Sequence, residues 1–394
     1  MSNRKKNNVL KFPEISGNLV SRGMWDVLDQ FKSQYGFVTV IPFYVARSDK
    51  KISLSRLSTK SNFLMKASPV WMWIYAVIST HQLVKAFFSS TIKGVSILQI
   101  FIRVGILFFI LAITGISWTL AFNEAVAGTI LNTALVLDRK FSDLRIVTTK
   151  MTSRRTELFL KLLITESFCL AMIAPLFIVL PNLDALSDYL FPKLALRSFG
   201  YCFVRYVALV LVMIEITKSV ATFLILGKIM LACSTRAALG LNEHIKIGGN
   251  LLLASRMYYQ LGLFNQFLNS EFCSNSMPPI ILFGTGLIIL LNYGTIRFYG
   301  RISNLIYPFI PFVNIVTYFF PLILLPETVN VIEKSAKFLA TARHKKLTKY
   351  EKRVIYSLKA VGIRCGEFGV VSTSWATKLV ETGLNYTATM LLTF

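Results

Sequence analysis

Long apolar runs, separated by shorter polar segments, dominate the chain from residue 68 to its end. Each run approaches the roughly 20 residues that an α-helix needs to cross the hydrocarbon core of a bilayer. The pattern therefore predicts an all-α membrane protein with seven transmembrane helices. The predicted spans are 68–88, 96–122, 158–180, 198–233, 278–299, 303–325 and 375–394.

Three of the runs depart from a plain spanning helix. The run 198–233 is too long for one bilayer, so we expect its inner end to project from the membrane as a cytosolic helix. The run 303–325 carries Pro308, Pro311 and Pro321, which we expect to kink it. A short apolar run, 37–45, cannot cross a bilayer and is expected to lie at the interface or packed under the bundle.

Composition agrees with a membrane protein, and the placement of charge gives its orientation. The chain is 54% hydrophobic and only 16% charged, with a mean hydropathy of +0.58 and a formal net charge of +24. With the N-terminus inside, the inner segments hold 31 Lys and Arg and the outer loops hold 4. Because positive residues stay in the cytoplasm, we predict a cytoplasmic N-terminus and an extracellular C-terminus. The inner segments are 1–67, 123–157, 234–277 and 326–374.

This placement also accounts for the basic charge without nucleic acid, because the cationic side chains face anionic lipid. The three histidines are scattered, so we expect no metal site. We see no phosphate-binding loop and expect no cofactor, no catalytic residues and no enzymatic activity. None of the five cysteines lies in an outer loop, so we expect no structural disulfide.

The last span is unusually polar for a helix in lipid. Its polar residues recur at helical spacing and form one stripe, whereas Leu379, Val380, Leu384 and Leu391 lie opposite. The stripe consists of Lys378, Glu381, Thr382, Asn385, Thr389 and Thr393.

Two interpretations of this stripe remain open. It can pack against polar groups of the other helices, with Lys378 and Glu381 paired at i, i+3. Alternatively it lines water, and because one helix cannot enclose a pore, several subunits would each contribute the same helix around a symmetry axis. Before it, Thr348 and Glu351 have capping-box spacing and begin a basic cytosolic helix.

Charged and aromatic residues within other spans are further candidates. Glu166 is a functional candidate by its depth. Glu215 and Lys218 are spaced to neutralise each other, and Arg205 is placed to contact a ligand or an outer-loop acid such as Asp184. Aromatic residues crowd the outer halves of the spans, where they serve as a membrane belt or line a pocket. The pocket candidates are Arg205, Tyr206, Tyr293, Tyr307 and Phe312.

The C-terminal residues add a resemblance to a known family. The run Gly-Ile-Arg-Cys-Gly-Glu-Phe-Gly-Val-Val at 362–371, followed by Asn-Tyr-Thr-Ala-Thr-Met-Leu-Leu-Thr-Phe at 385–394, resembles the end of the arthropod gustatory receptors, which are akin to insect odorant receptors. Members end in Thr-Tyr, five hydrophobic residues and Gln-Phe. Here Tyr386 and Phe394 are present, the spacing is one residue longer, Asn385 replaces the Thr, and Thr393 stands where Gln is usual.

The resemblance implies a ligand-gated, non-selective cation channel in the plasma membrane, built as a homotetramer and opened by a small tastant or odorant. It implies that the last helix lines a central pore, with Thr393 on the filter side and Met390 and Phe394 at the gate. Four parts of the chain follow. They are a cytoplasmic segment (1–67), a six-helix bundle with the ligand pocket (68–325), cytosolic anchor helices (326–374) and the pore helix (375–394).

Two other functions remain as alternatives. A G-protein-coupled receptor also has seven spans, but it needs the N-terminus outside, against the charge distribution. A secondary transporter would use Glu166 and Glu215 as coupling residues, but we detect no internal repeat.

Overall fold

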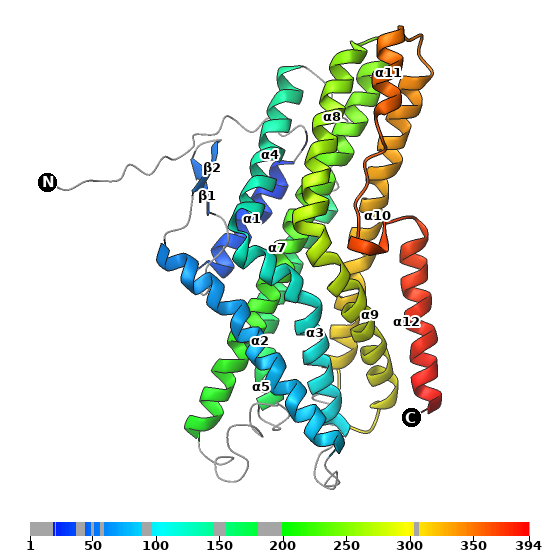
Figure 1. Ribbon diagram of the computed structural model, residues 1–394. Coiled ribbons are helices and arrows are strands. Elements are labelled where there is room, and N and C mark those ends of the chain that lie inside the picture. Colours follow the sequence, from blue (N-terminus) through cyan, green and yellow to red (C-terminus); the bar gives the residue numbers. More distant parts are fainter. Residues whose placement is uncertain are drawn as a thin grey trace, which may run out of the picture.

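The computed structural model describes residues 19, 21–36, 44–48, 51–55, 59–88, 97–144, 154–179, 199–302 and 307–393. These residues form an elongated bundle of helices beside one antiparallel two-stranded hairpin (Figure 1). The helices are α1 (Arg22–Tyr35), α2 (Thr59–Phe88), α3 (Ile97–Phe122), α4 (Glu124–Asp143), α5 (Arg154–Val179), α7 (Phe199–Lys246), α8 (Leu251–Leu268), α9 (Ser274–Arg297), α10 (Phe309–Arg343), α11 (Lys349–Ser357) and α12 (Ser374–Thr393). The strands are β1 (Tyr44–Ser48) and β2 (Lys51–Ser55).

The helices α2, α3, α5, α7, α9, α10 and α12 cover the predicted spans in order. By length and hydropathy, four segments of the described residues qualify as membrane spans: Ile97–Phe122, Glu157–Val179, Gly200–Lys246 and Leu251–Arg297. Helix α12 has 20 residues, which is about 30 Å and enough to cross, but its polar residues lower its hydropathy. The prediction of an all-α membrane protein is confirmed.

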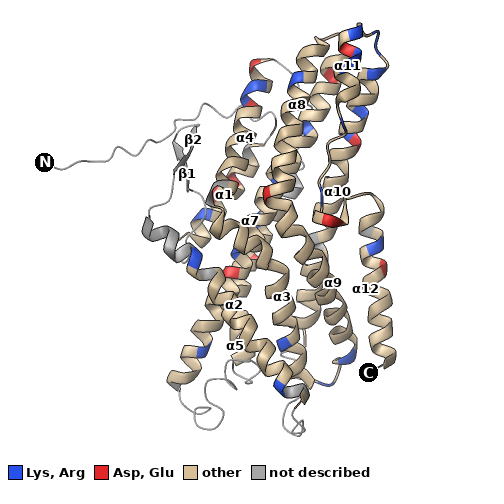
Figure 2. Cartoon of the chain, in the orientation of Figure 1, with Lys and Arg blue, Asp and Glu red and all other residues tan. Residues whose placement is uncertain are grey.

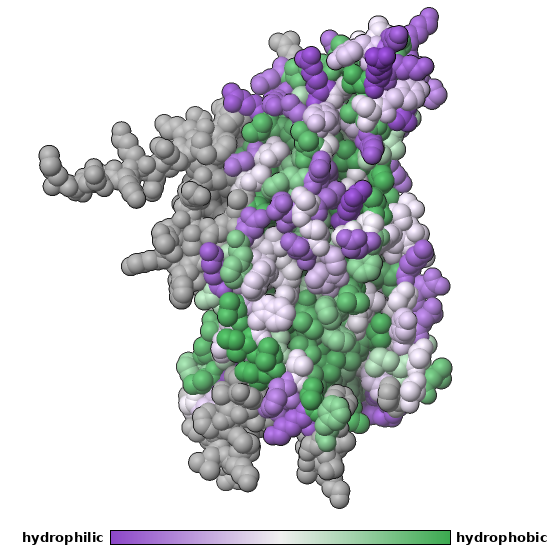
Figure 3. All heavy atoms as spheres, in the orientation of Figure 1, coloured by the Kyte–Doolittle hydropathy of each residue, from purple (hydrophilic) through white to green (hydrophobic). Residues whose placement is uncertain are grey.

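One end of the bundle extends beyond the predicted spans. Helix α7 continues past Cys233 to Lys246, as expected, and α10 continues to Arg343. With α8 and α11 these extensions form what we call the anchor end, at the top of Figure 1. Charged residues gather there in Figure 2, and Figure 3 shows the same end as hydrophilic above a more apolar body. On the predicted topology the anchor end is cytoplasmic.

The prolines of the sixth span act differently from one another. Pro308 caps the N-terminus of α10 and Pro311 lies in its first turn, where the missing N–H breaks no helical hydrogen bond. Within the helix interior the prolines are Pro321 and Pro326. The expectation that Pro308 and Pro311 kink this helix was therefore wrong, because the helix begins at these residues.

Helix α1 packs against α5 and α7. It buries Trp25, Leu28 and Phe31, and the Ser21 hydroxyl caps its first turn by accepting from the Met24 amide. Of the short apolar run 37–45, only the last two residues are described; Val45 lies in β1, opposite Leu54 of β2. The others lie outside the described residues.

The segment between α11 and α12 connects the anchor end to the last helix. The predicted capping box is confirmed, since Thr348 and Glu351 exchange side-chain and backbone hydrogen bonds at the start of α11. After α11 the chain forms a narrow turn in which the Val371 amide donates to the Ile363 carbonyl at 3.0 Å. The turn is possible because Gly366 and Gly369 adopt positive φ angles of 49° and 90°.

Candidate functional site

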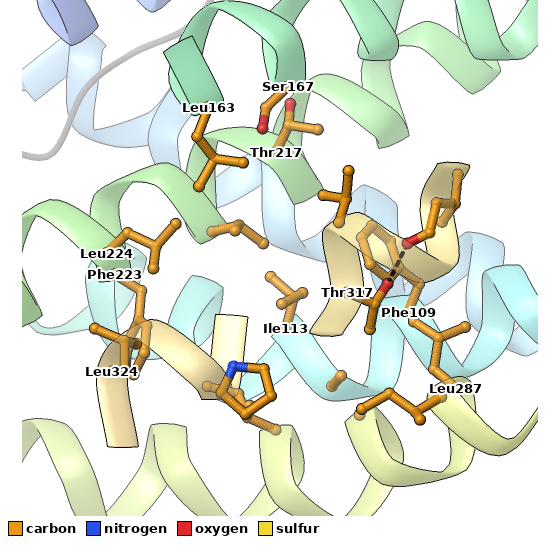
Figure 4. Close-up of a pocket in the computed structure, with 18 of the residues that line it drawn as sticks. Phe109, Ile113, Leu163, Ser167, Thr217, Phe223, Leu224, Leu287, Thr317 and Leu324 are labelled. Atoms are coloured by element: carbon orange, nitrogen blue, oxygen red, sulfur yellow. Dashed lines mark hydrogen bonds between the residues drawn. The ribbon is translucent and has the colours of Figure 1, made fainter. Parts of the chain in front are cut away.

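A cavity of about 290 Å³ lies inside the bundle, between α3, α5, α7, α9 and α10 (Figure 4). Two further residues reach it from the C-terminal part of the chain: Ile363, in the turn before α12, and Leu379, on α12 itself. Residues that represent its lining are Phe109, Ile113, Leu163, Ser167, Thr217, Phe223, Leu224, Leu287, Thr317 and Leu324. The cavity therefore contacts both the spanning bundle and the last helix.

The lining residues that the structure describes are mostly apolar and include no Asp, Glu, Lys, Arg or His. Its hydroxyl groups mostly bond to their own helices. Thr217 donates to the Met213 carbonyl at 2.9 Å, and Thr317 donates to the Val313 carbonyl at 2.8 Å. A charged ligand would lose its hydration here without gaining a counter-charge, so the cavity suits a neutral, largely apolar molecule.

The five predicted pocket residues do not line this cavity. Their polar groups instead join helices. The Arg205 guanidinium donates to the Val179 carbonyl at 3.4 Å, the Tyr206 hydroxyl to the Met172 carbonyl at 3.0 Å, and the Tyr307 hydroxyl to the Thr295 carbonyl at 2.8 Å. Tyr293 is buried in an apolar cluster, and Phe312 is 43% exposed on α10. A ligand contact at these residues stays a prediction.

The predicted ion pair within the fourth span is present. Lys218 donates to Glu215 at 2.5 Å, with both side chains almost fully buried, and the Ser117 hydroxyl adds a hydrogen bond to Glu215 at 3.2 Å. Burial of one charge without the other would be costly. The pair therefore has a structural role. The side chain of Glu166 is exposed on α5, and Asp184 lies outside the described residues.

Helix α12 packs against α9 and α10 through one face (Figure 1). Gly383 and Thr387 are buried at the contact, and a Cβ at Gly383 would lie 3.3 Å from the Ile288 Cγ2 atom. Asn292 of α9 donates to the Thr387 hydroxyl at 3.3 Å and to the Tyr318 hydroxyl at 2.8 Å. Interhelical hydrogen bonds and small residues at close contacts are typical of helix packing in membranes.

The predicted polar stripe faces away from this contact. Five of its six residues are exposed, namely Lys378, Glu381, Asn385, Thr389 and Thr393, and Thr382 is half-buried. Within the part of the chain that the structure describes, Lys378 and Glu381 form no ion pair. The interpretation that the stripe packs against the chain's own helices is therefore wrong, because another face of α12 makes that contact.

Other parts of the prediction for α12 have mixed outcomes. Leu384, which was predicted to lie opposite the stripe, is 56% exposed. Met390 packs against the apolar cluster around Phe101 and Leu291, and so does Leu391. The assignment of Met390 and Phe394 to a gate stays a prediction, and Phe394 lies outside the described residues.

Sequence reasoning missed the cavity lining and the Asn292 network. Asn292 is a polar residue inside the span 278–299, and this is the one signal that could have indicated it. The cavity lining had no such signal, because leucine, isoleucine and phenylalanine look alike whether they line a cavity or fill a core.

Comparison with solved structures identifies the architecture. The chain is similar to the structure of the insect olfactory receptor OR5 from Machilis hrabei in complex with eugenol, with a TM-score of 0.63 and 14% sequence identity. The match covers 94% of this chain and 98% of that chain. The fold is that of an insect olfactory receptor. A second OR5 structure gives a TM-score of 0.65 and 13% identity over 94% of this chain and 99% of that one.

The olfactory-receptor fold accounts for nearly the whole chain. No protein-family model and no curated protein matches the sequence. The structural likeness thus confirms the fold that the C-terminal resemblance implied, whereas the gustatory assignment stays a prediction.

Proposed function

We propose that this chain is a gustatory-type chemosensory receptor and acts as a ligand-gated, non-selective cation channel in the plasma membrane. Four copies surround a central pore, α12 of each copy lines it, and the anchor end holds the copies together. The ligand is a small neutral molecule that occupies the apolar cavity. The likeness to OR5, which was solved with eugenol, supports a small-molecule ligand.

One observation carries the proposal. Helix α12 presents an amide, hydroxyl groups and a carboxylate outward from the bundle, while Gly383 and Thr387 fix its other face to α9. Such a stripe is unfavourable in contact with lipid. Copies of the chain arranged around an axis place these groups in water, and Glu381 then attracts cations.

Two threonines of α12 supply a matched test. Thr389 is exposed and Thr387 is 5% exposed, although they are two residues apart on the same helix. We expect a charged, water-soluble thiol reagent to modify Thr389→Cys and change the ligand-evoked current in cells expressing only this chain. Thr387→Cys should react much more slowly. Equal reaction of the two variants would contradict the pore assignment.

The alternatives are separable from the channel. A coupled-type receptor places the C-terminus inside the cell, so an epitope after Phe394 would stain only permeabilised cells, whereas the channel topology predicts staining of intact cells. For a transporter, the buried Glu215 would have to bind its coupling ion while paired to Lys218 at 2.5 Å. That pairing disfavours the transporter.

A further inference from the structure

The cavity is long in the direction of the helices. Its lining runs from Phe309 to Thr328 on α10, from Met213 to Leu231 on α7, and from Leu160 to Ile178 on α5. At 1.5 Å per residue, each stretch spans about 27 Å. This length approaches the thickness of the hydrocarbon core, which is about 30 Å.

The cavity is also narrow. A volume of about 290 Å³ distributed over such a length leaves a slender passage instead of a broad chamber. A compact ring would occupy only part of it. A straight, flexible chain of methylene groups would fill it from end to end, and apolar contact along that length is the main source of affinity in such a site.

The two ends of the passage differ in what they contact. Phe101, Phe177 and Phe309 line one end, and Phe101 belongs to the apolar cluster that Met390 and Leu391 of α12 pack against. At the opposite end the lining includes Leu379 of α12 and Ile363 of the turn that precedes it. Only a long occupant contacts the phenylalanines and Leu379 at the same time.

We propose that the cavity binds a neutral, linear aliphatic molecule, and that chain length determines recognition because only long chains reach Leu379. This rests on the proposed function for its consequence, the opening of the pore, but not for binding itself. A fatty acid in its anionic form is disfavoured, because the described lining residues include no cationic side chain. Ser167 and Thr217 lie on one side of the cavity (Figure 4), where a hydroxyl or ester group can meet them.

Glycines in the lining allow the passage to be shortened by design. Gly227 lies toward the Leu379 end, and nothing lies within 4 Å of a Cβ built on it. A β-carbon at this position therefore displaces no neighbour, and a leucine side chain built from it fills part of the cavity. Gly262 on α8 also has nothing within 4 Å but lies outside the lining, so Gly262→Leu is the matched control.

The test measures binding to the purified full-length chain, using tritiated straight-chain primary alcohols from hexanol to eicosanol. We expect affinity to rise about fourfold for each methylene that enters the cavity, up to a cutoff. The cutoff should move to shorter chains in Gly227→Leu and stay unchanged in Gly262→Leu. Partition into detergent also rises with chain length, but it is the same for both variants. Gly284→Val, at a lining glycine with only Ile280 nearby at 3.9 Å, is a second plug if the first variant does not fold.

A cutoff that is the same in the two leucine variants would overturn the proposal, as would tightest binding of the shortest alcohol. A lipid tail is the other source of an aliphatic chain. Displacement of the label by phosphatidylcholine at much lower concentrations than by unlabelled long alcohol would assign the cavity to lipid and reject a free ligand. If the proposed channel function is wrong but the binding proposal is right, the chain will bind the alcohols as expected and cells expressing it will show no current.

Discussion

The side-chain amide of Asn292 on α9 donates to the Thr387 hydroxyl on α12 at 3.3 Å, and it does so at the buried face of the last helix. The side-chain amide of Asn314 on α10 donates in turn to the side-chain oxygen Oδ1 of Asn292 at 2.9 Å. One side chain thus joins three helices and fixes the rotation of α12. That rotation decides which residues of α12 face outward.

Replacing Asn292 by leucine should lower the stability of the folded chain by about 1–3 kcal/mol, because it leaves the polar groups of Asn314 and Tyr318 without their partner. Thermal unfolding of the purified protein measures this. The control is Asn385→Leu, an identical change at an exposed position of α12, which should alter ion conduction with little effect on stability. Similar losses of stability in both variants would show that the Asn292 hydrogen bonds contribute no specific stability to the fold.

Close approach of α12 to α9 depends on Gly383. A Cβ there would lie 3.3 Å from the Ile288 Cγ2 atom and 3.6 Å from the Tyr318 hydroxyl. Gly383→Leu should therefore push the helices apart and cost about 1–3 kcal/mol, read as a lower apparent melting temperature. Ala388→Leu places the same side chain on the exposed face of this helix and should leave the melting temperature almost unchanged.

The buried pair of Glu215 and Lys218 predicts strong non-additivity. Lys218→Met should destabilise the chain by about 3–5 kcal/mol, because the Glu215 carboxylate is then buried without a counter-charge. Adding Glu215→Leu should recover most of that loss. If the double variant is as unstable as the sum of the two single variants, the two charges do not depend on each other.

The capping box of α11 makes the anchor end sensitive to acid. Hydrogen bonds from the Thr348 backbone and side chain lower the pKa of the Glu351 carboxyl below its ordinary value. A lowered folded-state pKa stabilises the fold above the unfolded-state pKa, and this contribution is lost as the pH falls through the folded-state value. Amide exchange in the first turn of α11 should thus quicken on acidification. Glu351→Gln should remove this pH dependence.

A thiol in the turn between α11 and α12 should resist modification. Burial raises the pKa of Cys365 to about 11, so little thiolate is present at neutral pH. Alkylation of Cys365 in the native protein should be slow at pH 7 and accelerate as the pH rises toward that value. Mass spectrometry of the peptide that contains Cys365 measures this, and rapid alkylation at pH 7 would show that the side chain is accessible and ionised.

Hydropathy predicted the spanning helices because lipid imposes one requirement on all of them: about 20 apolar residues with every backbone group bonded. Helix α12 satisfied this only in part, and its stripe still indicated which side faces outward. The same reasoning gave the pair of Glu215 and Lys218, since both residues are on one helix and their spacing fixes their distance.

Features that depend on several helices could not be predicted from the sequence. The aromatic residues Tyr206 and Tyr307 were reasonable pocket candidates, yet their hydroxyls bond to backbone carbonyls of neighbouring segments. The cavity exists where side chains from five helices fail to fill the space between them. Its presence depends on the distances between the helices, and these cannot be predicted from the sequence of any one helix.

Helices α8 and α9 are continuous through a π-helical turn at Asn269–Cys273, which holds one residue more than an α-helical turn would. The Asn269 side chain there pairs with the backbone of Gly362 and Arg364, at 3.0 and 2.9 Å. Deleting one residue of this turn would rotate α9 by about 100° relative to α8. Asn292 would then turn away from Thr387, so the inserted residue of this turn sets the rotation at which α9 meets the last helix.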